Sequence, residues 1–573
     1  MLALLQALGF ILLTWCVVGA VFTGIGALAR SILFGVSPRR GGDVFSSFWI
    51  GWAITIVYAQ LWQLFFPIDM WAWAIPVALA GYGLCRCGQG TGAIIWAGVT
   101  HRPMTALFLV LVALWTANHA MAPLINYDAG LYHLATIRWE NSYPIIPGLG
   151  NLHGRLAFNS SAYLYMALLN VGPWIGKAHS LANSLLLVVL LAEEVISLTR
   201  ILRPREGSQA APTDVVLALL TLPTVLFALT LGGGVAGTSN DMIVFILQVI
   251  VSIQVLQLLA TRDMSTTDRR MCLFTIILLA AMGVLVKLSF GAFGLTAISI
   301  AIAAFIRLQP SERRSWSIPF VLSLTVMICA ILPWAVRGII LSGYPAYPNT
   351  WLSVPVDWRV PTSHAIAEGN SIIGWARFPG LTWQESLGNW HWIQPWFVSN
   401  QRDFMPPLLV TLIVVALTPV FSRTGANPRK ALWLFLVPSV VGIAAWLATA
   451  PDPRFAGALF WLLATGSIAL TVFSRVRQVQ LVTAVLLLAV IIAQSNPALG
   501  VAALPVAPGP NGGFYNIPVT ALHTITVSKE LTLYVPVSGE QTWDAPLPSA
   551  PAPPTHLYLR CSQTLLCGFR TKS

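Results

Sequence analysis

The chain has 573 residues, of which 56% are hydrophobic and only 9% are charged. Soluble globular domains carry about 25% charged residues, so lipid must be the solvent for most of this chain. The formal net charge of +12 does not indicate nucleic-acid binding, because the cations stand in short loops between apolar runs. Composition therefore predicts an all-α polytopic membrane protein with no nucleic-acid partner.

Fourteen apolar runs approach the length of about 20 residues that a helix needs to cross a bilayer. The third run is short, and the eighth lies directly against the ninth. Together they predict a transmembrane domain over residues 1–497, followed by a tail over residues 498–573. The expected spans lie near residues 8–28, 46–66, 70–85, 104–122, 180–199, 213–232, 241–260, 272–288, 291–307, 318–341, 406–422, 431–449, 454–474 and 479–497.

The distribution of cations predicts the orientation of these spans. If the amino terminus lies outside, every second loop is cytoplasmic, and these short loops hold more than half of the 32 Lys and Arg residues. Cytoplasmic loops carry such an excess of cations. Three large segments are then extracytoplasmic, namely 123–179, 342–405 and the tail. Within the first, Ala162 to Val171 is too short to span, so we expect it to lie along the interface or to re-enter.

The tail combines many prolines with alternating runs such as Leu531 to Val535, which are typical of strands. We therefore expect a small β-containing region. Cys561 and Cys567 stand close together in this polar tail. They could form a disulfide if the tail lies outside the cytoplasm, where thiols are oxidised.

A polar segment directly follows the fourth expected span and reads Asn-Tyr-Asp-Ala-Gly-Leu-Tyr-His over residues 126–133. An interfacial carboxylate can accept a proton from a hydroxyl or bind a divalent cation such as Mg²⁺ or Mn²⁺. Asp128 is therefore our first candidate for catalysis and for metal binding, and His133 is a candidate that orients the reacting group. A turn or helix-cap role for Asp128 and plain hydrogen bonding by His133 are the structural alternatives.

Further ionisable residues follow within the same segment. The run from Tyr143 to Arg155 mixes proline and glycine with His, Asn and Arg, which indicates a loop built for shape. We expect these residues to bind substrate, with hydrogen bonding as the structural alternative for the histidine. The candidates are Arg138, Glu140, His153 and Arg155.

A second element on the same predicted face is the glycine-rich turn over residues 232–241, which ends in Asp241. Thr238, Ser239 and Asp241 all suit a helix N-cap, and that role alone explains them. A glycine run that ends in a carboxylate beside the membrane also suits a polar head group. We therefore retain Asp241 as a further candidate for catalysis.

Three cations fall at the outer membrane level: Lys287, Arg337 and Arg454. Ionisable side chains at that depth are costly unless they pair or face a cavity. We expect Lys287 and Arg454 to hold a phosphate or pyrophosphate, with the guanidinium of Arg454 offering bidentate geometry. Arg337 is a further candidate for phosphate binding. Snorkelling to the interface is the alternative for all three cations, and most of all for Arg337.

The second large loop is rich in Trp, Pro and Tyr and contains Asp357 and Trp358. Aromatic faces stack on the C–H faces of sugars, and neighbouring charges bind the hydroxyls. An interfacial aromatic belt is the alternative for each Trp alone. We include Asp357 and Trp358 as candidates for substrate binding.

The many spans, an Asp just after an early span and an extracytoplasmic tail resemble the GT-C-type glycosyltransferases, which use polyprenyl-phosphate sugars at the outer membrane face. Several runs also resemble an uncharacterised bacterial family of multi-pass membrane proteins over nearly the whole chain. The runs that carry this second resemblance are Tyr127–His133, Tyr143–Leu156, Ser342–Pro345 and Trp543–Pro548.

The GT-C resemblance implies an inverting transferase that moves a sugar from a polyprenyl-phosphate carrier to a glycan or lipid acceptor. It would work in cell-envelope polysaccharide biosynthesis, at the periplasmic side of the bacterial inner membrane. Many GT-C enzymes place two acidic residues side by side in the first outer loop. Here Asp128 stands between Tyr127 and Ala129, so a second carboxylate would come from Glu140 or Asp241.

Two other functions remain open from the sequence. A polysaccharide polymerase or ligase that joins lipid-linked oligosaccharides would use the same outer loops and cations. A transporter of lipid-linked sugars would instead need charges near the bilayer midplane and symmetry between the two halves. The sequence shows neither feature clearly, so a transferase is the preferred expectation.

Overall fold

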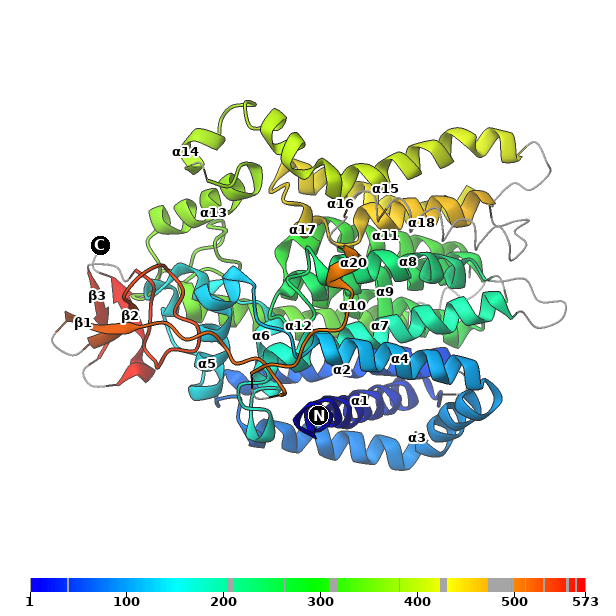
Figure 1. Cartoon of the computed structure of the whole chain (residues 1–573), viewed down its shortest axis with the longest axis horizontal. Coiled ribbons are helices and arrows are strands. Elements are labelled where there is room, and N and C mark those ends of the chain that lie inside the picture. The colour runs from blue at the N-terminus through cyan, green and yellow to red at the C-terminus, as the bar shows by residue number, and fades with distance from the viewer. Residues whose placement is uncertain are drawn as a thin grey trace.

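The structure is a computed structural model, and it shows a mostly helical chain (Figure 1). Long helices run side by side along the long axis, while the large loops and all four strands gather at one end. The structure describes every residue except 1, 39–40, 204–210, 262, 309–316, 381, 423–429, 473–491, 493–495, 497–498, 511, 529–530, 553–555, 562–563 and 572–573.

Seven helices in the described part of the chain are long and apolar enough to cross a membrane. The prediction of a helical membrane protein is confirmed at this level. The count of fourteen spans stays a prediction, and the expected span 479–497 lies almost wholly outside the described residues. The seven are α1 (Leu2–Phe34), α2 (Gly41–Gln63), α8 (Pro212–Leu229), α9 (Asn240–Ala260), α10 (Thr266–Val286), α11 (Gly291–Leu308) and α12 (Ser317–Ser342).

The other helices either belong to the bundle or lie at its loop end. Shorter apolar helices are α4 (Pro103–His119), α16 (Val437–Ala448), which continues from the 3-10 helix Lys430–Leu436, and α18 (Leu459–Val472). The remainder are α3 (Ala74–His101), α5 (Leu134–Ser142), α6 (Ser161–Leu168), α7 (Ala178–Leu202), α13 (Thr362–Arg377), α14 (Trp383–Ser386), α15 (Ile393–Ser422), α17 (Pro453–Ala456) and α20 (Leu499–Ala502).

Small residues allow the first two helices to touch along their backbones. A Cβ atom at Gly26 of α1 would lie 1.8 Å from the carbonyl oxygen of Ser47 in α2. A Cβ at Gly51 of α2 would lie 1.8 Å from the carbonyl oxygen of Phe22. Helices in lipid gain little from apolar burial against each other, so close backbone packing at small residues supplies much of their attraction.

The short helix α6 occupies the stretch that we expected to lie at the interface or to re-enter. Every residue from Ser161 to Leu168 is buried, and α6 packs against α2, α7 and α10. The stretch therefore lies inside the bundle and does not rest on its surface. Its burial fixes the loops on either side of it, which carry Asp128, Arg155 and the start of α7.

The tail returns along the bundle to the loop end (Figure 1). Asn118 of α4 exchanges two hydrogen bonds with the backbone of Val506, which holds the start of this return. Two antiparallel hairpins follow, β1 (Leu522–Ser528) with β2 (Leu531–Pro536) and β3 (Leu557–Leu559) with β4 (Phe569–Thr571). The strand expected near Leu531 is thus present.

The second hairpin docks on both large loops. The amide of Phe569 donates to the carbonyl oxygen of Pro147 in the first loop, and Arg560, directly after β3, donates to Asp357 in the second loop. Asn151 of the first loop donates to the carbonyl oxygen of Trp358 in the second. The expected disulfide between Cys561 and Cys567 closes the turn of this hairpin. The three segments that the sequence assigned to one side of the membrane are therefore in mutual contact.

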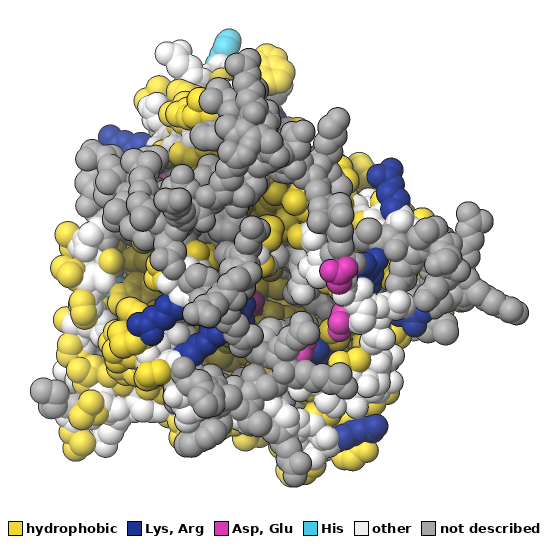
Figure 2. All heavy atoms as spheres, turned by 90° about the vertical axis from the view of Figure 1, so that its right-hand side faces the viewer, with side chains coloured by type: hydrophobic (Ala, Val, Ile, Leu, Met, Phe, Trp, Pro, Cys, Tyr) yellow, Lys and Arg dark blue, Asp and Glu magenta, His cyan; other side chains and the backbone are white. Residues whose placement is uncertain are grey.

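The opposite end of the bundle is shown in Figure 2 and has a different character. A cavity of about 890 Å³ opens there between the ends of α2, α7, α8, α9 and α10. None of the candidate site residues lines this cavity. The charged residues that line the cavity are Asp43, Glu193, Arg200, Asp214, Asp263 and Asp268. The candidate site therefore has to be sought at the loop end.

Candidate functional site

Asp128 begins the site, and its position follows from the local sequence. The side-chain oxygen of Asn126 accepts a hydrogen bond from the Asp128 amide at 2.9 Å, which forms a tight turn at the end of the loop. A π-helical turn, Ala129–His133, follows directly and continues into α5. Such turns are uncommon and concentrate at functional sites. The turn directs Asp128 and His133 toward the same region.

Two arginines from distant parts of the chain form ion pairs with Asp128. Arg155 Nη1 lies 3.3 Å from Oδ1 of Asp128, and Arg454 Nη1 lies 3.2 Å from Oδ2. Both carboxylate oxygens are therefore engaged, each by a different guanidinium. The three side chains retain between 18% and 28% exposure, so a ligand can still reach them.

The charge state of this centre follows from burial and from its neighbours. Burial by itself raises the pKa of the Asp128 carboxyl, but the positive charges of Arg454 and Arg155 outweigh burial and lower the pKa below its usual value. Burial lowers the pKa of His133 to about 4, despite the nearby carboxylates. The imidazole is thus neutral at pH 7, and the two guanidinium groups are what keep Asp128 ionised.

His133 is oriented by a neutral partner. Its Nδ1 lies 3.0 Å from the Thr238 hydroxyl, and both residues are buried. Thr238 belongs to the glycine-rich turn, where Gly233 and Gly234 adopt positive φ angles that favour glycine. The turn thereby reaches under the Asp128 loop and ends at the N-cap of α9.

Asp241 lies at that helix start and pairs with Lys287. The hydroxyl of Ser239, the N-cap residue, accepts from the Asp241 amide and lies 3.3 Å from Oδ2 of Asp241. Lys287 Nζ binds Oδ1 of the same carboxylate. Lys287 also lies over the ring of Phe455, 3.6 Å from its centroid. The cap role foreseen for Ser239 is confirmed, and Asp241 holds an ion pair in addition.

Arg454 comes from the short helix α17, which Asp452 caps. Oδ1 of Asp452 accepts from the Arg454 amide, and Oδ2 lies 3.3 Å from Arg454 Nε. Burial lowers the pKa of Arg454, but Asp241, Asp452 and Asp128 more than reverse this effect and raise it. Asp452 therefore both caps α17 and pairs with Arg454.

One member of the site was missed by sequence reasoning. Glu368 of α13 places Oε1 at 3.3 Å from Arg155 Nε, so Arg155 bridges Glu368 and Asp128. Nothing in the spacing or composition of the second loop distinguishes Glu368 from an ordinary loop carboxylate. We define the Asp128 cluster as Asp128, His133, Arg155, Asp241, Lys287, Glu368, Asp452 and Arg454.

Two other candidates form a separate buried network. Arg337 Nη2 lies 3.0 Å from Oε1 of Glu140, and the same guanidinium binds Asn159 and Gln63. Burial raises the pKa of Glu140 to about 7. The sequence suggested a phosphate ligand or a snorkelling cation at Arg337. The structure instead gives it a buried partner, because a guanidinium inside the protein needs one.

Three more candidates hold the tail in place. Arg138 binds the side chain and the backbone of Asp544. Asp357 receives two hydrogen bonds from Arg560, whose guanidinium also lies 4.4 Å from the Trp358 ring centroid. These partners lie in the tail, and none belongs to the Asp128 cluster. Arg560 covers one face of the Trp358 ring, and the sugar-stacking role expected for Trp358 stays a prediction.

His153 lies near the cluster in the chain and forms no ion pair with any residue that the structure describes. Burial lowers its pKa to about 3, and the charge of Arg155 adds to that effect. The imidazole is therefore neutral at pH 7. His153 stands two residues before Arg155 in the chain, and its substrate-binding role and the hydrogen-bonding alternative both stay predictions.

The tail also covers the Asp128 loop directly. The amides of Thr542 and Trp543 both donate to the carbonyl oxygen of Gly130 at 2.9 Å. Gln541 donates to the carbonyl oxygen of Tyr127 at 3.0 Å. A Cβ atom at Gly130 would lie 2.7 Å from the Trp543 ring, so this contact requires glycine. The tail thereby fixes the backbone on both sides of Asp128.

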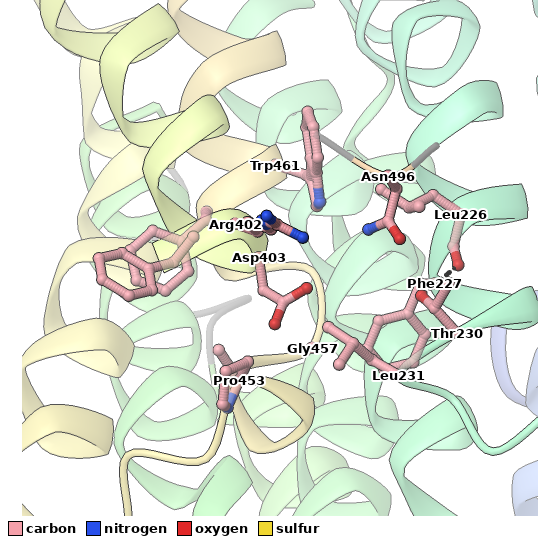
Figure 3. Close-up of a pocket in the computed structure, with 13 residues that line it drawn as sticks. Leu226, Phe227, Thr230, Leu231, Arg402, Asp403, Pro453, Gly457, Trp461 and Asn496 are labelled. Atoms are coloured by element: carbon pink, nitrogen blue, oxygen red, sulfur yellow. Dashed lines mark hydrogen bonds between the residues drawn. The ribbon is translucent and has the colours of Figure 1, made fainter. Parts of the chain in front are cut away.

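A small pocket lies beside α17 (Figure 3). Arg402 and Asp403 of α15 point into it from one side, and Asn496 faces them from the other. Its volume of about 20 Å³ suits roughly one water molecule. Pro453 lines the pocket and stands between Asp452 and Arg454, so the pocket borders the cluster.

The donor set of the cluster does not fit a divalent cation. Among the described residues, no group of three or more His, Cys, Asp or Glu side chains is arranged to hold a metal. Both oxygens of Asp128 face guanidinium groups, which compete with any cation for the same lone pairs. The metal role expected for Asp128 therefore gains no support from the geometry.

One comparison with known proteins gives a match. A family model described as "Domain of unknown function (DUF8201)" matches residues 9–461. That range includes every residue of the Asp128 cluster and ends before the tail. No curated protein and no solved structure matches the chain.

Proposed function

Because the chain belongs to the family described as Domain of unknown function (DUF8201), whose description names no activity, we propose its function from the site. We propose that it transfers a sugar from a polyprenyl-phosphate carrier to a glycan or lipid acceptor at the outer face of the membrane. The observation that carries this proposal is the Asp128 carboxylate held between the guanidinium groups of Arg155 and Arg454. The bilayer delivers the carrier sideways to this loop end.

Three cations of the cluster suit a phosphate. A guanidinium has five N–H donors, and each arginine uses only two of its nitrogens on carboxylates. The other donors of Arg155 and Arg454 remain for phosphate oxygens, in the planar geometry that arginine offers. Lys287 adds a third positive charge next to Phe455. These groups favour a phosphate whose negative charge grows as it leaves.

The reaction is a direct displacement at the anomeric carbon. The acceptor hydroxyl oxygen forms a bond to that carbon while the bond from carbon to phosphate oxygen breaks. The electron pair of the broken bond stays on the phosphate, and the hydroxyl proton passes to a carboxylate. A single displacement inverts the anomeric centre. Prearranged cations stabilise the leaving charge, which is commonly the largest catalytic contribution.

Asp128 has an electrostatic task in this scheme. It holds the guanidinium groups of Arg155 and Arg454 on either side of one carboxylate, so that their unused donors can bind the same phosphate. Without it, the two guanidinium groups would repel each other across a partly buried space. The inner-membrane location and the periplasmic orientation of the site belong to this same proposal.

The test uses membranes that contain the protein and radiolabelled polyprenyl-phosphate sugars. We expect wild-type membranes to move label from the lipid fraction to an acceptor fraction, and Asp128→Asn to reduce that rate at least about 100-fold, the range seen when one group that stabilises charge is removed. Product length separates single transfer from polymerisation. Equal rates in wild type, Asp128→Asn and membranes without the protein would contradict the proposal.

A further inference from the structure

A transfer to a hydroxyl needs a group that takes the hydroxyl proton, and the cluster offers four carboxylates. Three of them have both oxygens engaged. Asp128 faces two guanidinium groups, and Asp241 faces Lys287 and the Ser239 hydroxyl. Asp452 caps α17 with one oxygen and binds Arg454 with the other. Engaged oxygens are poor proton acceptors, because each hydrogen bond stabilises the ionised form.

Glu368 is different. Its Oε1 lies 3.3 Å from Arg155 Nε, and Oε2 has no hydrogen-bond partner among the described residues. The side chain retains 20% exposure, so the free oxygen is not sealed inside the protein. Glu368 is thus the one carboxylate of this cluster that has an uncommitted oxygen.

The backbone at Gly154 packs closely against this oxygen. A Cβ atom at Gly154 would lie 3.2 Å from Glu368 Oε2 and 3.0 Å from the Tyr347 hydroxyl, so even a methyl group there would crowd both polar atoms. Gly154 immediately precedes Arg155, so this glycine lets Oε2 lie next to the Asp128 cluster.

We propose that Glu368 is the residue that takes the proton from the acceptor hydroxyl, at its uncommitted and partly exposed Oε2. This role rests on the proposed function of the same cluster. The proton moves from the hydroxyl oxygen to Oε2 of Glu368 as the new carbon–oxygen bond forms. The electron pair of the broken bond remains on the phosphate.

The surroundings of Glu368 agree with this role. Burial raises the pKa of Glu368, although the charge of Arg155 acts against it. The titratable groups that face it are Arg155 and Tyr347, and Asp128 lies beyond Arg155. Loss of charge on Glu368 would weaken its pair with Arg155. Arg155 is then released toward the phosphate at the step when negative charge appears there.

The experiment compares Glu368→Gln with Glu385→Gln in the lipid-linked sugar transfer assay. Glu385 lies in the same large loop and forms an exposed capping box at α14. Among the described residues, it forms no hydrogen bond or ion pair with the cluster. We expect Glu368→Gln to lower the transfer rate at least about 100-fold, within the range for general-base catalysis, with unchanged binding of the donor. We expect Glu385→Gln to keep the wild-type rate, and Glu368→Asp to recover part of the loss.

Two further readouts separate proton transfer from a structural effect. The wild-type rate should fall with decreasing pH as Glu368 becomes protonated, and the residual rate of Glu368→Gln should lack this acidic limb. Gly154→Ala should lower the rate while keeping the carboxylate, because its methyl group would lie 3.2 Å from Oε2 and would displace it. An unchanged rate and pH profile in Glu368→Gln would overturn the inference.

The failure of this inference can be told from the failure of the proposed function. If wild-type protein transfers sugar and Asp128→Asn does not, the function stands. A Glu368→Gln variant that is as active as Glu385→Gln then refutes the role of Glu368 alone. If wild-type protein transfers no sugar from any polyprenyl-phosphate donor, both proposals fall.

Discussion

The buried pair of Arg337 and Glu140 predicts that removing one partner costs more stability than removing the other. Both side chains are less than a tenth exposed, and their closest atoms are 3.0 Å apart. Glu140→Gln leaves the Arg337 guanidinium without a counter-charge. Arg337→Gln leaves the Glu140 carboxyl without its cation. Breaking a buried ion pair typically costs about 3–5 kcal/mol. The two variants should nevertheless differ, because only one of the remaining groups can become neutral.

An arginine does not lose its proton inside a protein. Glu140→Gln should therefore lie at the upper end of the range, about 4–5 kcal/mol less stable. Burial has already raised the pKa of Glu140 to about 7, so without Arg337 the carboxyl takes up a proton at little cost. Arg337→Gln should then cost only about 2–3 kcal/mol, since one pKa unit corresponds to about 1.4 kcal/mol.

The same pair predicts the sign of a pH dependence in the wild-type protein. The folded pKa of Glu140, about 7, lies above its ordinary value of 4.5, so the folded chain binds the extra proton. The resulting stabilisation is fully present below the ordinary value and is lost as pH rises through about 7. Glu140→Gln should not show this contribution.

The assay is the apparent unfolding temperature of purified protein in detergent, followed by tryptophan fluorescence across this pH range. Binding of a short-chain polyprenyl phosphate is measured in parallel. We expect both variants to lose stability while the folded fraction keeps its affinity. Equal losses in the two variants would refute the asymmetry. A loss of affinity without a loss of stability would refute the structural role of Arg337 and make it a ligand.

Two further predictions concern the cover and the cations of the cluster. Gly130→Ala should push Trp543 away and lower the free energy of unfolding by about 1–3 kcal/mol, as overpacking does. The hydrogen-exchange rate of the Tyr127 to Gly130 amides should rise. An unchanged exchange rate would show that the tail does not hold this loop. Lys287→Gln should weaken binding of the short-chain polyprenyl phosphate about tenfold, because one charge-assisted hydrogen bond is worth about 1.5–3 kcal/mol. Fluorescence titration measures this affinity, and an unchanged value would confine Lys287 to neutralising Asp241.

Much of the fold was predictable because it depends on the solvent. A chain with 9% charged residues cannot cover itself with polar surface, so apolar helices in lipid follow from composition. The strand near Leu531 and the disulfide of Cys561 with Cys567 also follow from local pattern. Asp128 stood out for a local reason as well, since it is a carboxylate directly after an apolar run.

The partners of Asp128 could not be found in this way. Arg454 lies 326 residues further along the chain, and the bundle must form before the two can meet. Charge at a membrane surface looks the same in sequence whether the residue binds phosphate, snorkels or pairs. Only packing revealed that Arg337 lies beside Glu140 and Arg454 beside Asp128.

Composition and local pattern, then, determined by themselves that this chain is helical, lies in lipid and carries polar chemistry near Asp128. Only the tertiary structure decided which charges share one space. It added Glu368, which no spacing reveals, and it assigned Arg138, Asp357 and Trp358 to the docking of the tail. The reason is physical: hydropathy acts on each segment separately, whereas a charged site depends on distances between segments that the chain brings together only on folding.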